Sequence, residues 1–292
     1  MRAALVVLVT IAAGCGGGRP SSTPARTTTR PAPPAATPVA GLRVGVVGPL
    51  DVRVPGAIVE RHSLDRMPGY RLVVVSAEVD DAATVAAAAD AHPETHYALV
   101  GSPTRGERRP NLAGVVLRED QAAFLGGVVA GLVAVEEGGT TKRVAWAGPQ
   151  ERALAGAFGR GARSIDAGVG ILHAWSSDSP AACKEAALGS IARAAVVVMA
   201  HGGRCADAAI AGAHQQNRVG LRLADFELPG VAAAQIVREA VAGVYHGGED
   251  ILFGAASGAI GVNRLDHRIS GATAIAARTA AQDLASGRRP SG

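Results

Sequence analysis

Aromatic residues are scarce in this chain. Its 292 residues include four Phe, three Tyr and two Trp, or 3% in all, so few rings are available to stack on nucleic-acid bases. Charge is modest as well: 29 Lys and Arg against 25 Asp and Glu leave a formal net charge of +4, and no Lys/Arg cluster alternates with aromatic residues. We therefore expect no nucleic-acid partner.

Motifs that carry catalysis are also missing. The sequence has no G-x-S-x-G elbow, no H-E-x-x-H, no phosphate-binding P-loop and no G-x-G-x-x-G after a strand. Its eight His residues are scattered without the spacing of metal ligands. We expect a protein that is not an enzyme and that needs no cofactor and no metal.

The apolar run at the N-terminus is short. Residues 3–13 follow the single positive charge of Arg2, and they are too few to span a bilayer. The run ends in small residues directly before Cys15, the pattern that a lipoprotein signal peptidase accepts when the Cys is lipid-modified. We interpret residues 1–15 as a lipoprotein signal peptide ending at the acylated Cys15; the alternative is a secreted protein in which this Cys is incidental.

Residues 16–40 are rich in Pro, Thr, Ser and Gly and show no periodic apolar pattern. This composition predicts a disordered tether between the lipid and the globular part. The predicted location is the extracytoplasmic side of a cell membrane, reached through the lipid anchor.

The two remaining cysteines, Cys183 and Cys205, would then lie outside the cytosol, where thiols tend to pair as a disulfide. Both stand near predicted helix starts. Because neighbouring helix axes lie about 8–10 Å apart and a disulfide needs closer Cα atoms, two buried free thiols remain an equal alternative.

From residue 42 onward, β-branched runs alternate with Ala-rich stretches of helical character, which predicts an α/β fold with mostly parallel sheets covered by helices. Nine strands are too many for one compact sheet of this length, so we expect two lobes. The predicted strands are 42–47, 71–76, 96–100, 113–116, 143–147, 170–175, 195–199, 219–223 and 251–253. The predicted helices include 82–91, 120–136, 151–165, 180–192, 204–216 and 230–245.

One predicted helix is unusual because Gly126, Gly127 and Gly131 lie inside it. A glycine within a helix costs up to about 1 kcal/mol relative to Ala, so these glycines need a structural reason. Close packing of another backbone is the reason we expect.

Several segments resemble one family. Residues 111–132 (NLAGVVLREDQAAFLGGVVAGL) look like the F-L-A-G-x-x-A-G signature of the basic membrane protein family, the substrate-binding lipoproteins of ABC importers that include purine nucleoside receptors. Residues 142–164, 181–203 and 243–263 resemble later segments of the same family, in the same order. The resemblance implies a two-lobed periplasmic-binding-protein-like fold that captures a small polar solute between its lobes and passes it to an ABC transporter permease.

The same resemblance divides the chain into two discontinuous lobes. The amino-terminal lobe is expected to comprise 41–140 and 227–254, and the carboxy-terminal lobe 141–226 and 255–292. Because few residues separate the first strand from Ser102, we expect the amino-terminal lobe to be shortened by one βα unit.

Solute in such folds meets the loops at the carboxyl ends of parallel strands, where helix N-termini also point. Asp225 further matches the position at which the family places a ligand-binding carboxylate; the alternative is a helix-capping Asp. The candidate ligand-binding residues are Asp51, Ser102, Trp175, Asp178, His201 and Asp225.

Two family features are missing. Nucleoside receptors carry Phe-Asn after the Asp that follows the first strand, whereas no aromatic follows Asp51 before Tyr70. The family also carries a Lys in the helix that follows the second passage of the chain between the lobes, near residues 226–230. The predicted helix 230–245 offers only Gln235 and Arg238 there. The residues therefore give no support to a nucleoside, and an envelope scaffold or sensor lipoprotein that has lost the solute site is the alternative hypothesis.

Overall fold

The computed structural model describes residues 39, 41–66, 69–137 and 139–291, and Ala36–Gly292 form one compact unit. The signal peptide, Cys15 and nearly all of the tether lie outside the described residues. Among the described helices, none is long and apolar enough to cross a membrane. The described residues contain no group of three or more His, Cys, Asp and Glu side chains placed to hold a metal ion.

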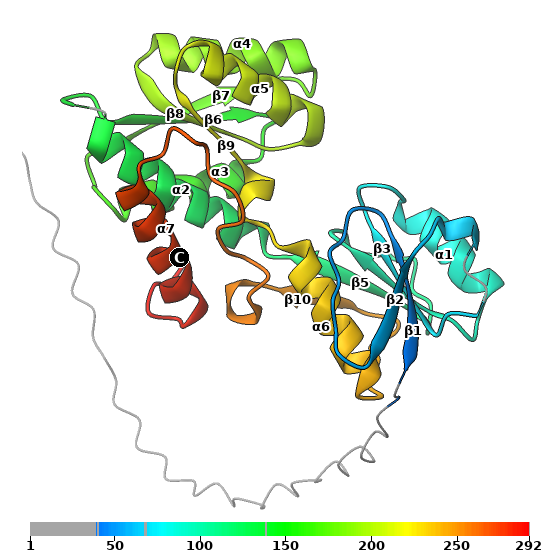
Figure 1. The fold of residues 1–292 in the computed structure, drawn as a ribbon. Coiled ribbons are helices and arrows are strands. Elements are labelled where there is room, and N and C mark those ends of the chain that lie inside the picture. Colours follow the sequence, from blue (N-terminus) through cyan, green and yellow to red (C-terminus); the bar gives the residue numbers. More distant parts are fainter. Residues whose placement is uncertain (1–38, 40, 67–68, 138, 292) are drawn as a thin grey trace, which may run out of the picture. The chain divides into compact units, whose positions relative to one another are not determined.

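The described strands form two parallel sheets, which confirms the predicted fold class (Figure 1). The first sheet has the order β10-β5-β4-β3-β1-β2 and the second the order β7-β6-β8-β9. The first sheet contains β1 (Leu42–Val47), β2 (Ala57–Arg61), β3 (Leu72–Ser76), β4 (His96–Val100), β5 (Leu112–Leu117) and β10 (Asp250–Phe253). The second contains β6 (Arg143–Gly148), β7 (Gly170–Trp175), β8 (Ala195–Ala200) and β9 (Val219–Arg222).

Helices cover both sheets because fully buried parallel strands need an apolar partner on each face. The helices are α1 (Ala82–Ala91), α2 (Glu119–Glu137), α3 (Arg152–Arg163), α4 (Pro180–Ala192), α5 (Gly203–Gln215), α6 (Pro229–Val241) and α7 (Gly271–Ala285), with 3-10 turns η1 (Leu64–Arg66), η2 (Leu223–Phe226) and η3 (Ala255–Ser257). On the second sheet, α4 and α5 cover one face, and α2 and α3 cover the other (Figure 1).

The contacts of α2 differ from the predicted lobe boundary at residue 140. This helix packs against α3, β6, β8 and α7, which belong with the second sheet. The chain therefore passes between the two sheets near Arg118, before α2, and the Gly-rich break near residue 139 is only the loop between α2 and β6. Three passing segments lie side by side here: Arg118 N–H donates to Phe253 O at 2.8 Å, and Leu228 N–H donates to Ala259 O at 2.8 Å.

Close backbone packing explains two of the three glycines in α2, as predicted. A Cβ on Gly127 would lie 2.0 Å from the carbonyl oxygen of Phe158 in α3, and one on Gly131 would lie 2.6 Å from that of Ala162. Gly126 instead makes room for side chains, because its Cβ would meet Met199 at 2.5 Å.

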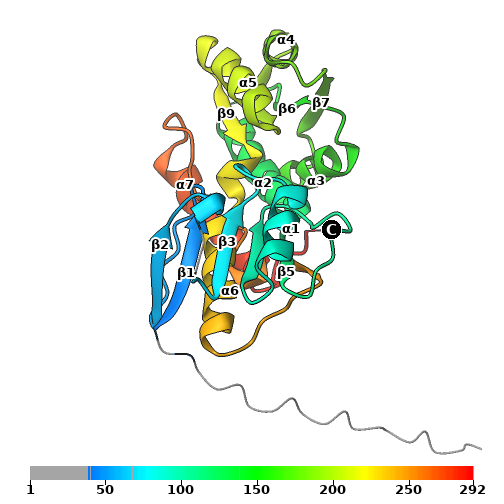
Figure 2. The ribbon, with the colours of Figure 1, turned by 90° about the vertical axis from the view of Figure 1, so that its right-hand side faces the viewer.

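The shortening of the first lobe takes a form that the sequence did not reveal. Strand β2 is present although it was not predicted, and it pairs in parallel with β1. The helices on either side of it are missing: in the described residues between β1 and β3, the only helical turn is η1. Figure 2 shows β2, β1 and β3 side by side in this sheet.

Candidate functional site

Three of the candidate residues gather at one edge of the second sheet. Strands β6, β7 and β8 all end here, and Ser176 N–H donates to the carbonyl of Gly148 at 2.9 Å, which joins the ends of β7 and β6. Trp175 ends β7, Asp178 lies in the loop before α4, and His201 follows β8. We call Trp175, Asp178 and His201 the strand-end group.

Two glycines bring the loops of this group together. Gly202 has a φ of 87°, which favours a residue without a Cβ, and a Cβ placed there would lie 3.8 Å from a carboxylate oxygen of Asp178. A Cβ on Gly148 would lie 3.5 Å from the carbonyl oxygen of His201. The loops after β6, β7 and β8 therefore form one continuous surface.

Trp175 offers an aromatic face at this surface. Its side chain is 38% exposed, and its ring stacks on that of His173 with 5.2 Å between ring centroids and an interplanar angle of 20°. The two residues lie on the same side of β7 because they are two apart along the strand. A planar or partly apolar solute can rest on such a ring.

Helix starts supply donors at the same strand-end edge of the second sheet. Helix α4 begins after Ser179, whose hydroxyl accepts from the Ala182 N–H at 3.3 Å, and α5 begins after Gly202. The first backbone N–H groups of a helix lack intrahelical partners and attract acceptor or anionic groups of a ligand.

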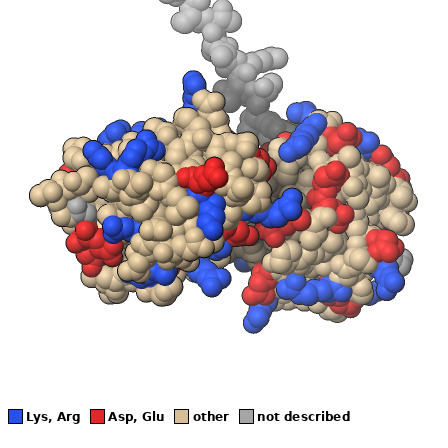
Figure 3. All heavy atoms as spheres, turned by 90° about the horizontal axis from the view of Figure 1, so that it is seen from above, with Lys and Arg blue, Asp and Glu red and all other residues tan. Residues whose placement is uncertain are grey.

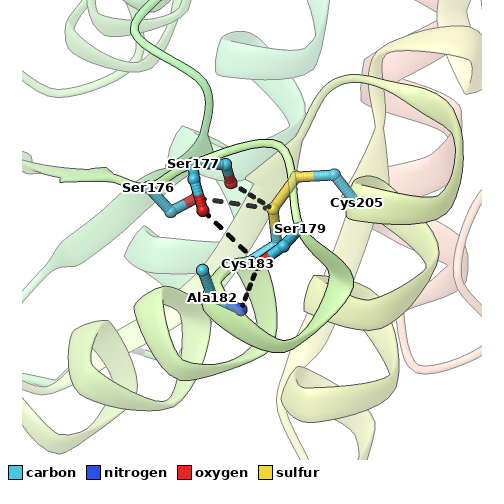
Figure 4. Close-up of a disulfide and its surroundings, with 6 residues drawn as sticks. All are labelled: Ser176, Ser177, Ser179, Ala182, Cys183 and Cys205. Carbon is cyan, nitrogen blue, oxygen red and sulfur yellow. Dashed lines mark hydrogen bonds between the residues drawn. A yellow bond between two sulfur atoms is a disulfide. The ribbon is translucent and has the colours of Figure 1, made fainter.

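A disulfide joins these two helix starts (Figure 4). Cys183 and Cys205 are fully buried, and their Cα atoms lie 5.4 Å apart, within the range that a disulfide requires. Ser176 Oγ lies 3.4 Å from Cys183 Sγ, and in the disulfide form the hydroxyl is the donor. The bridge therefore fixes the first turns of α4 and α5 relative to each other, next to Ser176 and Gly148 at the ends of β7 and β6.

The first-sheet candidates lie in other surroundings. Asp51 is exposed and pairs with Arg53 at 3.2 Å. It lines two cavities, one of about 740 Å³ between the β1–β2 loop and β2 and one of about 430 Å³ beside the start of α6. Ser102 pairs with Val115 in an isolated bridge, and its hydroxyl donates to Pro103 O at 3.2 Å.

The side chain of Asp225 makes a local hydrogen bond that caps a turn. One carboxylate oxygen accepts from the Arg222 N–H at 2.8 Å, across the 3-10 turn η2, and burial raises the pKa of this carboxyl above its ordinary value. It lines a separate cavity of about 160 Å³ with His214, Arg264 and Asp266. Neither this cavity nor either of the two at Asp51 is lined by Trp175 or His201, so these three cavities do not join the six candidates into one pocket.

No sequence pattern indicated a functional role for Glu227. This residue follows Phe226, in the segment before Leu228 where the chain passes between the two sheets. Burial, with the nearby charges of Glu119 and Glu78, raises its pKa to about 7. These carboxylates meet only in the fold, because they come from distant parts of the chain. The one local signal is the position of Glu227 directly after an apolar turn.

A second residue without a sequence signal is Asp266. Its side chain is 2% exposed, and it accepts from the backbone N–H groups of Gly220 and Arg268, both at 3.0 Å, and contacts His214 Nε2 at 2.8 Å. Because Gly220 lies on the edge strand β9, Asp266 satisfies a donor that a further strand would otherwise bond.

The charged surface gives no sign of a nucleic-acid site on the face that Figure 3 draws. Lys and Arg side chains are spread over it among Asp and Glu, and no continuous basic stripe crosses it.

Solved structures with the same fold were found, whereas no protein-family model and no curated protein matches the sequence. An ABC transporter solute-binding protein from Aeropyrum pernix is 18% identical, with a TM-score of 0.51 over 85% of this chain and 92% of that one. One from Conexibacter woesei is 16% identical, with a TM-score of 0.54 over 85% and 98%. The fold is periplasmic-binding-protein-like. A transcriptional activator of the comK gene from Bacillus halodurans shares this periplasmic-binding-protein-like fold at 10% identity and a TM-score of 0.57, over 85% of this chain and 99% of that one.

Proposed function

We propose that this chain is the substrate-binding protein of an ABC importer. It captures a small polar solute between its two lobes and passes the solute to a permease, and it performs no chemistry. The shared fold with two ABC transporter solute-binding proteins supports this role. The ordered segments of residues 111–263 that resemble the basic membrane protein family support placing the chain near that family.

The strand-end group is the observation that carries the proposal. Trp175 supplies a partly exposed ring, Asp178 a carboxylate, and the starts of α4 and α5 supply backbone donors, all at the same strand-end edge of the second sheet. Such a combination of one apolar face with a few fixed polar groups is typical of small-molecule sites. The solute class it suits is a polar molecule with a flat or apolar side.

A thermal-shift screen of nucleosides, bases, sugars and amino acids tests the proposal on residues 36–292, the compact unit. A ligand at 100 times its Kd stabilises the folded state by about 2.7 kcal/mol. For a domain of this size that corresponds to a rise in Tm of roughly 5–10 °C. Nucleosides are included in the screen because the resemblance to the basic membrane protein family implies them. The absence of the family's Phe and Lys from this chain favours other solutes.

Variants decide whether a positive solute binds at the strand-end group. Trp175→Ala and Asp178→Ala should both abolish the shift. Asp178→Ala should leave the Tm of the free protein nearly unchanged because its side chain is exposed, whereas Trp175→Ala lowers it somewhat through the lost stacking on His173, so each shift is measured against the Tm of its own free variant. Glu185→Ala is the matched control, since Glu185 is an exposed acid on the middle of α4. A shift that survives in Trp175→Ala and Asp178→Ala would move the solute site elsewhere.

The anchor is tested separately on the full chain. Wild type should incorporate labelled fatty acid and fractionate with membranes, and Cys15→Ser should lose the label and remain unprocessed. Equal release of both forms into the medium would exclude the anchor and leave the alternative of an ordinary secreted protein.

An envelope scaffold or sensor lipoprotein is the second candidate. The missing helices around β2 and the local capping role of Asp225 favour it, because both reduce what the first lobe and the passing segments can offer a solute. Failure of every solute class to raise the Tm, with the protein folded and anchored, would favour the scaffold over the importer component.

A further inference from the structure

The first sheet has one half-covered face. Helix α1 packs over β4 and β5 on the side where Val47, Val73 and Tyr97 point. The connection from β2 to β3 would normally bring a second helix to the same side, over β1 and β2. In its described residues that connection forms only the 3-10 turn η1, so this part of the face lacks a helix of its own.

A groove lies where that helix would be. It has a volume of about 680 Å³ and lies between α1 and η1. Thr84, Ala88 and His92 line one wall: the first two are four residues apart on one side of α1, and His92 follows as the residue that caps its C-terminus. We call this the α1–η1 groove.

The floor and far wall of the α1–η1 groove are largely apolar. Val47 from β1, Leu64 from η1 and Val79 after β3 line it. Val79 is 51% exposed, and Ile58 on the edge strand β2, which by strand alternation points to the same side, is 50% exposed. Half-exposed aliphatic side chains gathered on one side of a sheet indicate a surface that a partner covers.

The carboxylates among the described residues that line the groove are not matched by a Lys or Arg in the same lining. Asp65 and Asp80 line it directly, and no Lys or Arg stands among its described lining residues. Asp81 caps the start of α1. The nearby cations are Arg61, whose Nη1 donates to the carbonyl oxygen of the lining residue Gly48 at 3.1 Å, Arg66, beside Asp65, and Arg105, beside Asp81. A partner that brings positive charge to the lining carboxylates Asp65 and Asp80 is therefore favoured.

We infer that the α1–η1 groove receives an amphipathic helix of a partner protein. The apolar side of that helix covers Val47, Leu64 and Val79, and its Lys or Arg side chains pair with Asp65 and Asp80. A helix fits better than a compact solute because the groove lies along α1, and a second helix about 8–10 Å from α1 would complete the layer. The contact requires no solute and adds an interaction surface to the proposed function.

The chemistry of the occupant is tested with model peptides and residues 36–292. The probe is a labelled peptide of about 18 Leu and Lys residues with Leu at i, i+3, i+4 and i+7, and its controls are the scrambled sequence and the same pattern with Glu in place of Lys. Fluorescence anisotropy should show the amphipathic Lys peptide binding at least tenfold more tightly than either control.

Charge reversal distinguishes a docking surface from a general loss of structure. Asp65→Lys combined with Asp80→Lys should weaken the Lys peptide at least tenfold and strengthen the Glu peptide, which a misfolded protein cannot do. Val79→Glu should weaken both, whereas Ile275→Glu, on the exposed side of α7, should weaken neither.

Three outcomes would overturn the inference. Equal binding of the Lys and Glu peptides to the parent protein would show that Asp65 and Asp80 do not select a positively charged partner. A dimer of the free protein that Val79→Glu dissociates would make a second copy the occupant. A loss of stability in Val79→Glu that exceeds the loss in Ile275→Glu would mean that the groove is closed by the chain itself.

Discussion

The crossing of α2 and α3 should tolerate no side chain at Gly161. A Cβ at this position would lie 2.0 Å from the carbonyl oxygen of Phe124, and the reciprocal contact joins Gly127 to the carbonyl oxygen of Phe158 at the same distance. An ordinary contact between such atoms is at least 3.4 Å. Because both obstacles are backbone atoms, Gly161→Ala forces the two helices apart by more than 1 Å.

The expected cost follows from two opposing effects. Overpacking of a core costs about 1–3 kcal/mol, and the upper end applies here because separating the helices also loosens the buried side chains of Phe124 and Phe158. Ala in place of Gly within a helix returns about 1 kcal/mol. We therefore expect Gly161→Ala to lower the free energy of unfolding by about 2 kcal/mol.

The same helix provides the control. A Cβ at Gly156 would have only Arg160 Nη1 nearby, at 3.8 Å, so Gly156→Ala should gain helix propensity without a clash and stabilise the protein by about 0.5–1 kcal/mol. Urea denaturation of residues 36–292, followed by far-ultraviolet circular dichroism, measures both. The reasoning fails if Gly161→Ala is as stable as the parent, or if the two substitutions shift stability in the same direction.

Three further predictions concern stability. Replacing Cys183 and Cys205 together by Ala should cost about 3 kcal/mol, the loop-closure term for a sequence separation of 22, and alkylation of the unreduced parent followed by mass spectrometry should find no free thiol at either. The raised pKa of Glu227 means that this carboxyl binds its proton more tightly in the folded state than in the unfolded state, so the free energy of unfolding should fall as the pH rises from 4.5 to about 7. Urea titrations should show that Glu227→Gln loses this pH dependence and is more stable than the parent by roughly 2 kcal/mol at pH 8. Burial opposes ionisation of Asp266, but donors from Gly220, Arg268 and His214 hold its pKa below the ordinary value, so its stabilisation exists above pH 3.8 and is lost in more acidic solution. Asp266→Asn should lower stability at pH 7 by about 2–4 kcal/mol and flatten the acid limb of the curve, and an unchanged acid limb would contradict this.

The strands of both sheets could be predicted because most are buried on both faces. Runs such as VVVS in β3 and AVVVMA in β8 are continuous apolar stretches, and the structure places each within a residue or two of the prediction. Strand β2 was missed because its sequence AIVER is only half buried and mixes apolar with charged residues. Helix α7 has an Ala- and Thr-rich sequence without a clear apolar side, which is why periodicity did not indicate it.

The candidate site was predictable only where topology decides position. Trp175 and Asp178 lie at the end of β7 and in the loop after it, and His201 follows β8, which β6 separates from β7. The rule for strand ends brings all three to the same edge of the second sheet. The same rule selected Asp225, yet a backbone N–H three residues away takes one of its oxygens, and local geometry of that kind is invisible in a sequence. The perturbed Glu227 depends on neighbours from distant segments, so no local pattern could indicate it.

The position of β10 in the first sheet has a consequence for folding order. The second sheet uses strands from residues 143–222 joined by single helices, whereas the first is complete only when Asp250 reaches Gly114, across the whole of the second sheet. Loop-closure entropy delays contacts of such sequence separation, so we expect the second sheet to form early and the first to finish last. Until α6 and β10 arrive, one side of β3, β4 and β5 lacks its helix and the outer edge of β5 lacks its partner, and the nascent first sheet is then most open to aggregation.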